Sequence, residues 1–240
     1  MSIPLVSVVS SAAKPYLWAD WYKSMEGTIP FEVVAVGPNP PTYALPNNFK
    51  FILSKVKPVQ CWEIATRNAI GQYLVFMADD QLLQGPDPFK RLIAEYMSYN
   101  TDKLMLSLRW LSNVGLAPIG IHQHVTDPNI YMPVGFMITN NFYRHLGGLD
   151  RNFIALYWDL DLCFRVAMDG LTRVSSVIAL EKANISPGLW DAYKQVDQEV
   201  TVNKIWPITL GQPLKRSQPL EPFVDDNILL VSQGPKGVWA

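Results

Sequence analysis

The sequence contains few cysteines and no long hydrophobic run. Only Cys61 and Cys163 are present among 240 residues, and their wide separation fits neither a disulfide framework nor a metal site. No apolar stretch is long enough to span a bilayer, and the N-terminus does not have the pattern of a signal peptide. We therefore expect a protein without a membrane span, located in a reducing compartment such as the cytoplasm.

The sequence also has almost no net charge. Its 20 Lys and Arg residues and 21 Asp and Glu residues give a formal net charge of -1. Proteins that draw their affinity from a phosphate backbone usually carry an excess of positive charge. A nucleic-acid partner is therefore not favoured, although a local basic patch would still permit one. The sequence gives no indication of the oligomeric state.

Extended and helical patterns alternate through the first half of the chain. The composition, 49% hydrophobic and 17% charged, indicates a folded protein with a substantial core. Such alternation predicts an α/β fold, with a mostly parallel, Rossmann-like central sheet flanked by helices. The expected strands are 3–10, 31–36, 49–53, 73–78 and 104–108, and the expected helices are 16–25, 59–70 and 86–97.

The second half is less regular. Residues 112–132 form a long polar stretch interrupted by Gly and Pro, which is typical of a functional loop. We expect one domain over residues 1–206 and a Pro-rich tail, 207–240, that packs on it. The elements expected after the loop are an extended segment at 133–139, a helix at 159–168, a strand at 172–178, a helix at 190–206 and a strand at 227–232.

Two adjacent acids, Asp79 and Asp80, follow the apolar strand at 73–78. Ligands of an open α/β sheet bind at the carboxyl ends of its strands, so the pair should lie at the binding edge. Carboxylates there suit hard cations such as Mg²⁺ or Mn²⁺, which commonly bridge one or two carboxylates and a diphosphate. A solvated turn before the next helix explains the pair about equally well.

Three further charged residues are candidates for a site. Arg67 precedes the acids by one helix and could contact a phosphate at the same edge, although a surface charge is the more economical reading. Asp159 lies at a predicted helix start, where an ionised carboxylate can act as general base or simply cap the helix. Asp161 and Arg165 have i, i+4 spacing, which favours a structural ion pair.

The order and spacing of four motifs make the sequence similar to the nucleotide-sugar glycosyltransferases of family 2. The resemblance extends from residue 3 to about residue 180 and implies the GT-A fold of that family, with a smaller sheet on the acceptor side. The motifs are Ala65-Thr66-Arg67-Asn68, Met77-Ala78-Asp79-Asp80, Gly147-Gly148-Leu149-Asp150, and Trp158-Asp159-Leu160-Asp161-Leu162 with Arg165.

The resemblance implies a reaction and assigns roles. A sugar, most simply from UDP-sugar, would move to an acceptor hydroxyl with inversion at the anomeric carbon. Asp159 would be the base, and Asp80 with Asp79 would hold Mn²⁺ or Mg²⁺ at the donor diphosphate. Residues 1–110 would bind the nucleotide sugar and 111–206 the acceptor. The other residues implied on the nucleotide side are Ser10, Ser11, Asn39 and Arg67.

The sequence departs from the family pattern at several positions. The family usually has an acid at the end of the second strand, where this chain has Gly37-Pro38-Asn39, and Asn39 could replace that acid. Ala78 stands where many members carry a further acid, and Trp158 replaces the acid before the base. These departures leave the nucleotide base undefined.

The acceptor is the least defined partner. A glycan is expected, but a protein or a hydroxylated DNA base would also supply a hydroxyl. The residues expected near it are Trp110, Trp158 and Asp161, together with His122, His124, Tyr131 and Trp190.

Two other functions compete with sugar transfer. A nucleotidyltransferase usually holds its triphosphate with a Gly-rich basic loop after the first strand, whereas residues 10–15 contain only Lys14 and no Gly. A non-catalytic protein that binds a sugar nucleotide or a glycan is the other alternative, because Ala78 and Trp158 replace two family acids.

Overall fold

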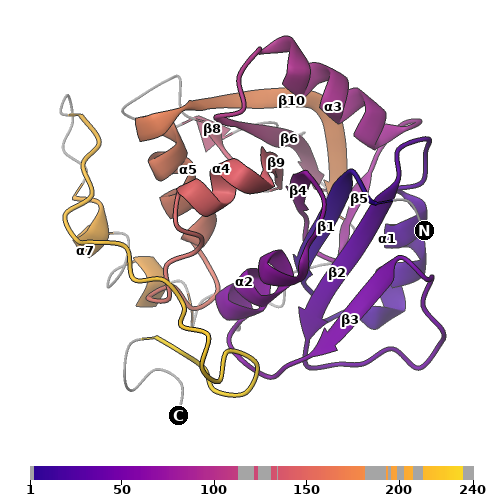
Figure 1. Cartoon of the computed structure of the whole chain (residues 1–240), viewed down its shortest axis with the longest axis horizontal. Helices are drawn as coiled ribbons and strands as arrows, with labels where there is room; N and C mark the ends of the chain where they lie inside the picture. The colour runs from indigo at the N-terminus through magenta and orange to yellow at the C-terminus, as the bar shows by residue number, and fades with distance from the viewer. Residues whose placement is uncertain are drawn as a thin grey trace.

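The computed structural model describes residues 3–112, 122–123, 131–133, 135–181, 193, 196–198, 203–207 and 213–234. Its centre is an eight-stranded sheet with the order β3-β2-β1-β4-β9-β6-β10-β5 (Figure 1). A second, two-stranded sheet pairs β7 (His122–Gln123) with β8 (Tyr131–Met132). The predicted α/β fold with a central sheet flanked by helices is confirmed.

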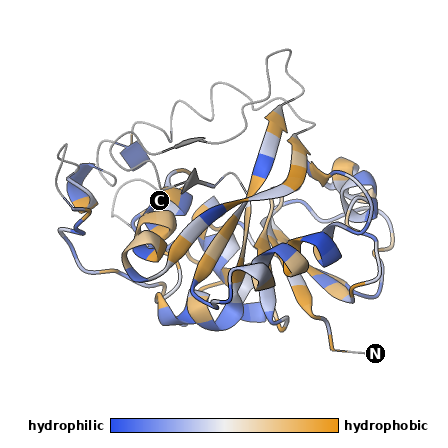
Figure 2. Cartoon of the chain, turned by 90° about the horizontal axis from the view of Figure 1, so that it is seen from above, coloured by the Kyte–Doolittle hydropathy of each residue, from blue (hydrophilic) through white to orange (hydrophobic). Residues whose placement is uncertain are grey.

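Four strands of the first half form a parallel block. They are β1 (Val6–Ser11), β2 (Phe31–Gly37), β3 (Phe49–Leu53) and β4 (Tyr73–Phe76). β1 lies in the middle, with Val9 paired to Val34 of β2 and to Phe76 of β4. Their Val, Ile and Phe residues are typical of strands buried on both faces. Figure 2 shows that hydrophobic residues are concentrated along the strands of this sheet.

The remaining strands make the sheet mixed. β9 (Phe136–Thr139) runs antiparallel between β4 and β6 (Leu104–Ser112). β10 (Leu171–Glu181) lies parallel to β6, and the short β5 (Gln81–Leu83) pairs antiparallel with the end of β10. The sequence did not predict β5, because three residues are too few to show a periodic pattern.

Helices cover both faces of the sheet (Figure 1). α2 (Pro58–Asn68), α4 (Asn140–His145) and α5 (Trp158–Asp169) pack on one face, in a core that includes Val9, Phe76 and Phe164. The 3₁₀ turn η1 (Pro15–Leu17) leads into α1 (Trp18–Lys23), and α1 and α3 (Pro88–Ser98) cover the other face. Among the described helices, none has the length and apolarity needed to cross a membrane.

Residues 203–207 and 213–234 pack on the face that carries α2 and α5. The short helix α7 (Asn203–Ile205) is followed by Trp206, and Trp206 and Phe223 are both buried in the core of that face. Gln60 of α2 donates hydrogen bonds to the backbone oxygens of Ile228 and Val231, at 2.7 and 2.9 Å. These contacts make the described part of the tail a layer over α2.

The tail does not form the strand predicted at 227–232. Asn227 has a left-handed backbone with φ of 59°, and its carbonyl accepts the N–H groups of Leu230 and Val231 at 3.0 Å. The segment therefore satisfies its backbone within a turn and not in a ladder. The predicted helix at 190–206 falls mostly outside the described residues.

Candidate functional site

The carboxyl ends of β1, β2 and β4 meet at one edge of the sheet, because the three strands are parallel and in register. Ser10 and Ser11 end β1, Asn39 follows β2, and Asp79 and Asp80 follow β4. These residues therefore lie at one edge of the sheet, as expected for the acid pair. We call this edge, with the loop 12–14 that follows β1, the acid edge.

Asp79 holds the backbone of the loop after β1. Its Oδ2 accepts hydrogen bonds from the N–H of Ala13 at 2.8 Å, the N–H of Lys14 at 2.6 Å and Nε1 of Trp18 at 3.0 Å. The side chain is buried, with 3% of the residue exposed. Burial raises the pKa of Asp79, and the hydrogen bonds from Trp18 and Lys14 offset only part of that shift.

Asp80 holds the side chain of the same loop. Its Oδ2 forms an ion pair with Nζ of Lys14, and its side chain is only 6% exposed. Burial by itself lowers the pKa of Lys14, but the hydrogen bond to Asp80 and the charges of both aspartates outweigh burial and raise the pKa above its usual value. Lys14 is therefore a protonated cation at neutral pH. The sequence reading had noted Lys14 only as the single basic residue of the loop.

The carboxylate oxygens that could bind a divalent ion are partly engaged by other groups. Asp79 and Asp80 each have one carboxylate oxygen engaged by the loop, and an ammonium group already lies against Asp80. No third His, Cys, Asp or Glu joins them to form a metal-binding group in the part of the chain that the structure describes. Metal binding at Asp79 and Asp80 stays a prediction, and it requires Lys14 to move away.

The end of β2 is packed too tightly for an acidic side chain at Gly37. A Cβ at Gly37 would lie 1.7 Å from the backbone oxygen of Ala12, so no side chain fits there while the loop keeps its position. Asn39 takes part differently from an acid, because its Nδ2 donates to the backbone oxygen of Ala13 at 3.0 Å. The hydroxyl of Ser10 is buried without a hydrogen-bond partner among the described residues, and Ser11 is half-buried.

The structure places Arg67 away from the acid edge. α2 leads from the carboxyl end of β3 to the amino end of β4, and Arg67 lies in its last turn. An 11-residue helix is about 16 Å long, so Arg67 lies near the opposite edge of the sheet. There Arg67 binds Glu63 at 2.9 Å, Asp225, and the backbone oxygen of Phe223 at 2.7 Å. It fastens the tail to α2.

Asp159 lies near the acid edge, in the first turn of α5. It follows Trp158, whose ring is 5.7 Å from that of Phe76, the last residue of β4. α5 therefore begins beside the carboxyl end of β4. Asp159 is half-buried, and its Oδ1 accepts the N–H of Leu160 at 2.9 Å. Burial raises the pKa of Asp159 to about 6, against the partial effect of backbone hydrogen bonds.

The segment before α5 is held by a residue that the sequence reading did not single out. Asp197 is buried and accepts the N–H groups of Ile154, Ala155 and Leu156 at 2.7 to 2.9 Å. Tyr157 follows with φ of 59°, and α5 then begins. Asp197 carries no recognisable motif, because its role depends on a contact between segments about 40 residues apart.

Asp161 has a structural role in this geometry. Its predicted pair with Arg165 is confirmed, at 2.8 and 2.9 Å. Its other oxygen accepts Nε1 of Trp206 at 2.9 Å and Nε of Arg216 at 3.2 Å, and Arg216 also pairs with Asp150. The side chain of Asp161 is fully buried, so the structure does not bring it to an acceptor surface. No sequence motif indicates this role of Arg216.

The aromatic candidates for acceptor contact divide into two groups. Trp158 is buried among Trp62, Phe76 and Phe136, with ring centroids 5.1 to 6.3 Å away. Trp110 of β6 is half-buried, and its indole Nε1 has no hydrogen-bond partner among the described residues. For His122 and Tyr131 only the strand backbone is described, and His124 and Trp190 lie outside the described residues.

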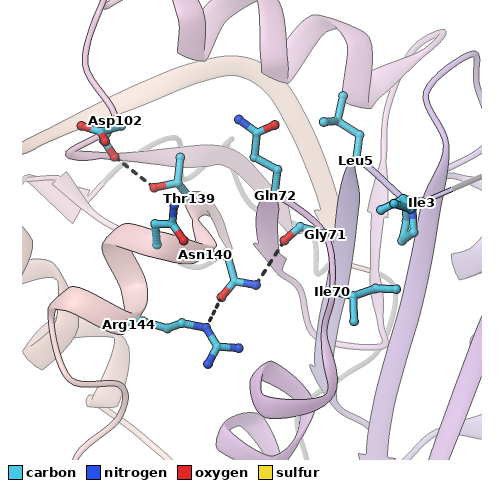
Figure 3. Close-up of a pocket in the computed structure, with 11 residues that line it drawn as sticks. Ile3, Leu5, Ile70, Gly71, Gln72, Asp102, Thr139, Asn140 and Arg144 are labelled. Carbon is cyan, nitrogen blue, oxygen red and sulfur yellow. Dashed lines mark hydrogen bonds between the residues drawn. The ribbon is translucent and has the colours of Figure 1, made fainter.

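Two depressions in the described surface lie at the amino-end edge, opposite the acid edge. One, of about 520 Å³, is shown in Figure 3 and is lined by Ile3, Gly71, Asn140, Arg144 and neighbouring residues. Asn140 in its lining donates to the backbone oxygen of Gly71 at 3.1 Å and accepts from Arg144 at 2.9 Å. The second depression includes Arg67 but no acid of the acid edge.

Solved structures of S. aureus TarS share this fold. The structure of TarS residues 1–349 matches with a TM-score of 0.56 at 12% identity, covering 83% of this chain and 74% of that one. Its complex with UDP matches at 0.56 and 14% identity, covering 80% and 63%. Its complex with UDP-GlcNAc matches at 0.54 and 13% identity, covering 82% and 66%.

The likeness is one of architecture. This chain covers only 40% of the longer TarS structure, at 13% identity. No protein-family model and no curated protein sequence matches the chain. At this level of identity the TarS structures establish a common fold, and the roles of individual residues have to be argued from the contacts described above.

Proposed function

We propose that the protein is a glycosyltransferase of the GT-A type, which moves a sugar from a nucleoside-diphosphate sugar to an acceptor hydroxyl. The carrying observation is Asp159, a half-buried carboxylate with a raised pKa near the carboxyl end of β4. The fold is shared with TarS, whose structures include complexes with UDP and with UDP-GlcNAc. That likeness supports UDP-sugar as the donor.

The chemistry follows from the pKa of Asp159. A pKa of about 6 leaves the carboxylate ionised at neutral pH, yet much more basic than an ordinary aspartate. As the acceptor oxygen attacks the anomeric carbon, its proton passes to Asp159. The bond between that carbon and the diphosphate oxygen breaks on the opposite side, and the departing nucleoside diphosphate keeps the electron pair. A single displacement of this kind inverts the anomeric configuration.

The acid edge is the proposed donor side. Ser10, Ser11 and Asn39 lie at the ends of the strands, where ligands of open α/β sheets bind. In this proposal the donor diphosphate lies against loop 12–14, and the acceptor enters from the side of Trp110 and α5. The proposal routes no step through a divalent ion, because Lys14 already neutralises Asp80.

The deciding experiment is a donor panel. Purified protein is incubated with UDP-, GDP- and CMP-linked sugars and a mixture of glycan acceptors, and the release of free nucleotide is measured. We expect release from a UDP-sugar, lost in the Asp159→Asn variant and kept in Asp169→Asn. Asp169 ends the same helix but pairs at the surface with Lys103 and His145, so it is a matched control. Equal release by wild type and Asp159→Asn would refute the assignment of the base.

A protein that binds sugar nucleotides without turnover is the second candidate. The observation that favours it is the engagement of both Asp79 and Asp80 by loop 12–14, since these acids are then not free to hold a metal. Calorimetry with UDP-sugar, combined with the nucleotide-release assay, distinguishes these two candidate functions. Tight binding of UDP-sugar with no nucleotide release on any acceptor favours the second candidate.

A further inference from the structure

Both acids of the pair contact the same residue, Lys14. Asp79 accepts the backbone N–H of Lys14 at 2.6 Å, and Asp80 pairs with its side-chain Nζ. The neighbouring N–H of Ala13 also binds Asp79, at 2.8 Å. One carboxylate therefore fixes the backbone at residue 14 and the other fixes the direction of its ammonium group. Together the two acids hold one lysine at the acid edge.

The ammonium of Lys14 has capacity left for a ligand. An ammonium group carries three N–H donors, and among the described residues Asp80 is its only hydrogen-bond partner. The side chain is 29% exposed, whereas that of Asp80 is 6% exposed. The lysine side chain is therefore accessible to solvent, whereas the carboxylate that it contacts is nearly buried. Lysine is a common phosphate-binding residue, because its charge is concentrated at one point.

We propose that Lys14 binds the diphosphate of the donor, as a cation fixed by Asp79 and Asp80, and that nucleoside-diphosphate binding does not require a divalent metal. The inference rests on the proposed function and concerns the same site. Lys14 bridges a carboxylate and a phosphate, which is the role a metal ion would have between the same groups. Asp80 is then a positioning residue for Lys14.

The arrangement of the loop supports this assignment independently of the charges. Gly37 leaves room for the backbone oxygen of Ala12, and the N–H of Ala12 binds the oxygen of Val36 at 2.8 Å. Asn39 binds the oxygen of Ala13 at 3.0 Å. The ends of β2 and β4 therefore both fix the backbone that precedes Lys14. A lysine held in place in this way loses less freedom when it binds a phosphate.

The test measures UDP binding by calorimetry, once with EDTA and once with millimolar Mn²⁺. Wild type should bind with similar affinity in both buffers. Lys14→Met should weaken binding in EDTA by about tenfold or more, and Lys14→Arg, which keeps the charge, by clearly less. Lys23→Met is the matched control, because Lys23 is exposed at the end of α1 and its side chain makes no hydrogen bond or ion pair with the described residues. It should bind UDP as wild type does.

A direct measurement of Mn²⁺ accompanies the calorimetry. Paramagnetic resonance counts the Mn²⁺ ions bound by the protein without nucleotide, and we expect no stoichiometric binding by wild type. Removal of Lys14 alone leaves Asp80 buried without a partner, so the combined K14M and D80N variant serves as the folding control. Melting curves verify that each variant is folded.

The outcomes separate the inference from the function on which it rests. UDP binding that needs Mn²⁺ in wild type, or that persists unchanged in Lys14→Met and in the combined variant, overturns the role of Lys14 and leaves sugar transfer standing. If neither UDP nor any other nucleotide binds in either buffer, both the proposed function and the inference are overturned. Metal-independent binding that is lost with Lys14 supports both.

Discussion

The two acid pairs of this protein, Asp79 with Asp80 and Asp159 with Asp161, differ in how their carboxylates are engaged. Asp79 and Asp80 both hold loop 12–14. In the second pair, Asp161 accepts donors from Arg165, Arg216 and Trp206, whereas Asp159 accepts only a local backbone N–H among the described residues.

This difference separates structural from chemical acids. A carboxylate whose oxygens are engaged by several strong donors is committed to holding the fold. A carboxylate that is shielded from water but has few donors becomes more basic, as the pKa of about 6 for Asp159 shows. The comparison therefore supports Asp159, among these four acids, as the proposed base.

The sharpest test of the comparison is Asp159→Asn. We expect turnover to fall about 10²–10⁴-fold, because the acceptor proton loses its base. Stability should stay the same or rise, since burial of the ionised Asp159 is unfavourable and the amide removes that charge. Nucleotide release and thermal melting, measured on the same sample, test the expected loss of turnover and the expected unchanged or higher stability. A variant that unfolds more easily and still turns over contradicts the assignment.

Asp161→Asn should give the reverse result. It leaves Arg165 and Arg216 buried with one charge fewer between them, which we expect to cost about 3–5 kcal/mol of unfolding free energy. Denaturant titration measures the loss. Asp169→Asn, on the same helix, removes only surface ion pairs and should lower the unfolding free energy far less than Asp161→Asn does. Similar losses for both variants would remove the distinction between the two positions.

Gly37→Ala tests the packing of the loop that the first acid pair holds. The new Cβ would meet the oxygen of Ala12, which is backbone and has to shift, so we expect a loss of about 1–3 kcal/mol. Asn39→Ala adds no atom and removes one hydrogen bond to Ala13, so it should cost about 1 kcal/mol or less. Denaturant titration of the two variants side by side gives the comparison. An equal, small loss would show that the loop moves freely.

The last test is the pH dependence of activity. The folded-state pKa of Asp159, about 6, lies above the ordinary value of 3.8, so its base form is lost as the pH falls through 6. We expect kcat/KM to fall about tenfold per pH unit below that value. Because the raised pKa favours the protonated native state, this group adds stability as the pH falls from 6 towards 4. A profile flat from pH 7 to pH 5 would argue against Asp159.

Much of the acid edge could be predicted from the sequence. Runs of Val, Ile and Phe that alternate with helical patterns predicted parallel strands, and the residues after parallel strands must share an edge. The strand pattern therefore predicted Asp79 and Asp80 at this edge, and the resemblance to family 2 added Ser11 and Asn39 on the nucleotide side. Asp159 was correctly expected at the start of α5, where it is the second residue of the helix.

Arg67 shows where the same reasoning failed. The motif around Arg67 lies close to the acids in the sequence, but α2 ends at the amino-end edge of the sheet and carries the arginine away from them. Arg67 is separated from its partners Asp225 and Phe223 by about 160 residues of sequence. Local spacing contains no information about such partners.

The sequence by itself determined the α/β class, the edge at which the acids gather and the helix that carries Asp159, because these depend on short-range periodicity and on the direction of parallel strands. Only the tertiary structure decided which acids are engaged. Lys14 meets Asp80 across about 65 residues, and Arg216 meets Asp161 across about 55. Such contacts depend on which surfaces the core brings together, and they separate the acids that hold the fold from Asp159, the acid proposed to do the chemistry.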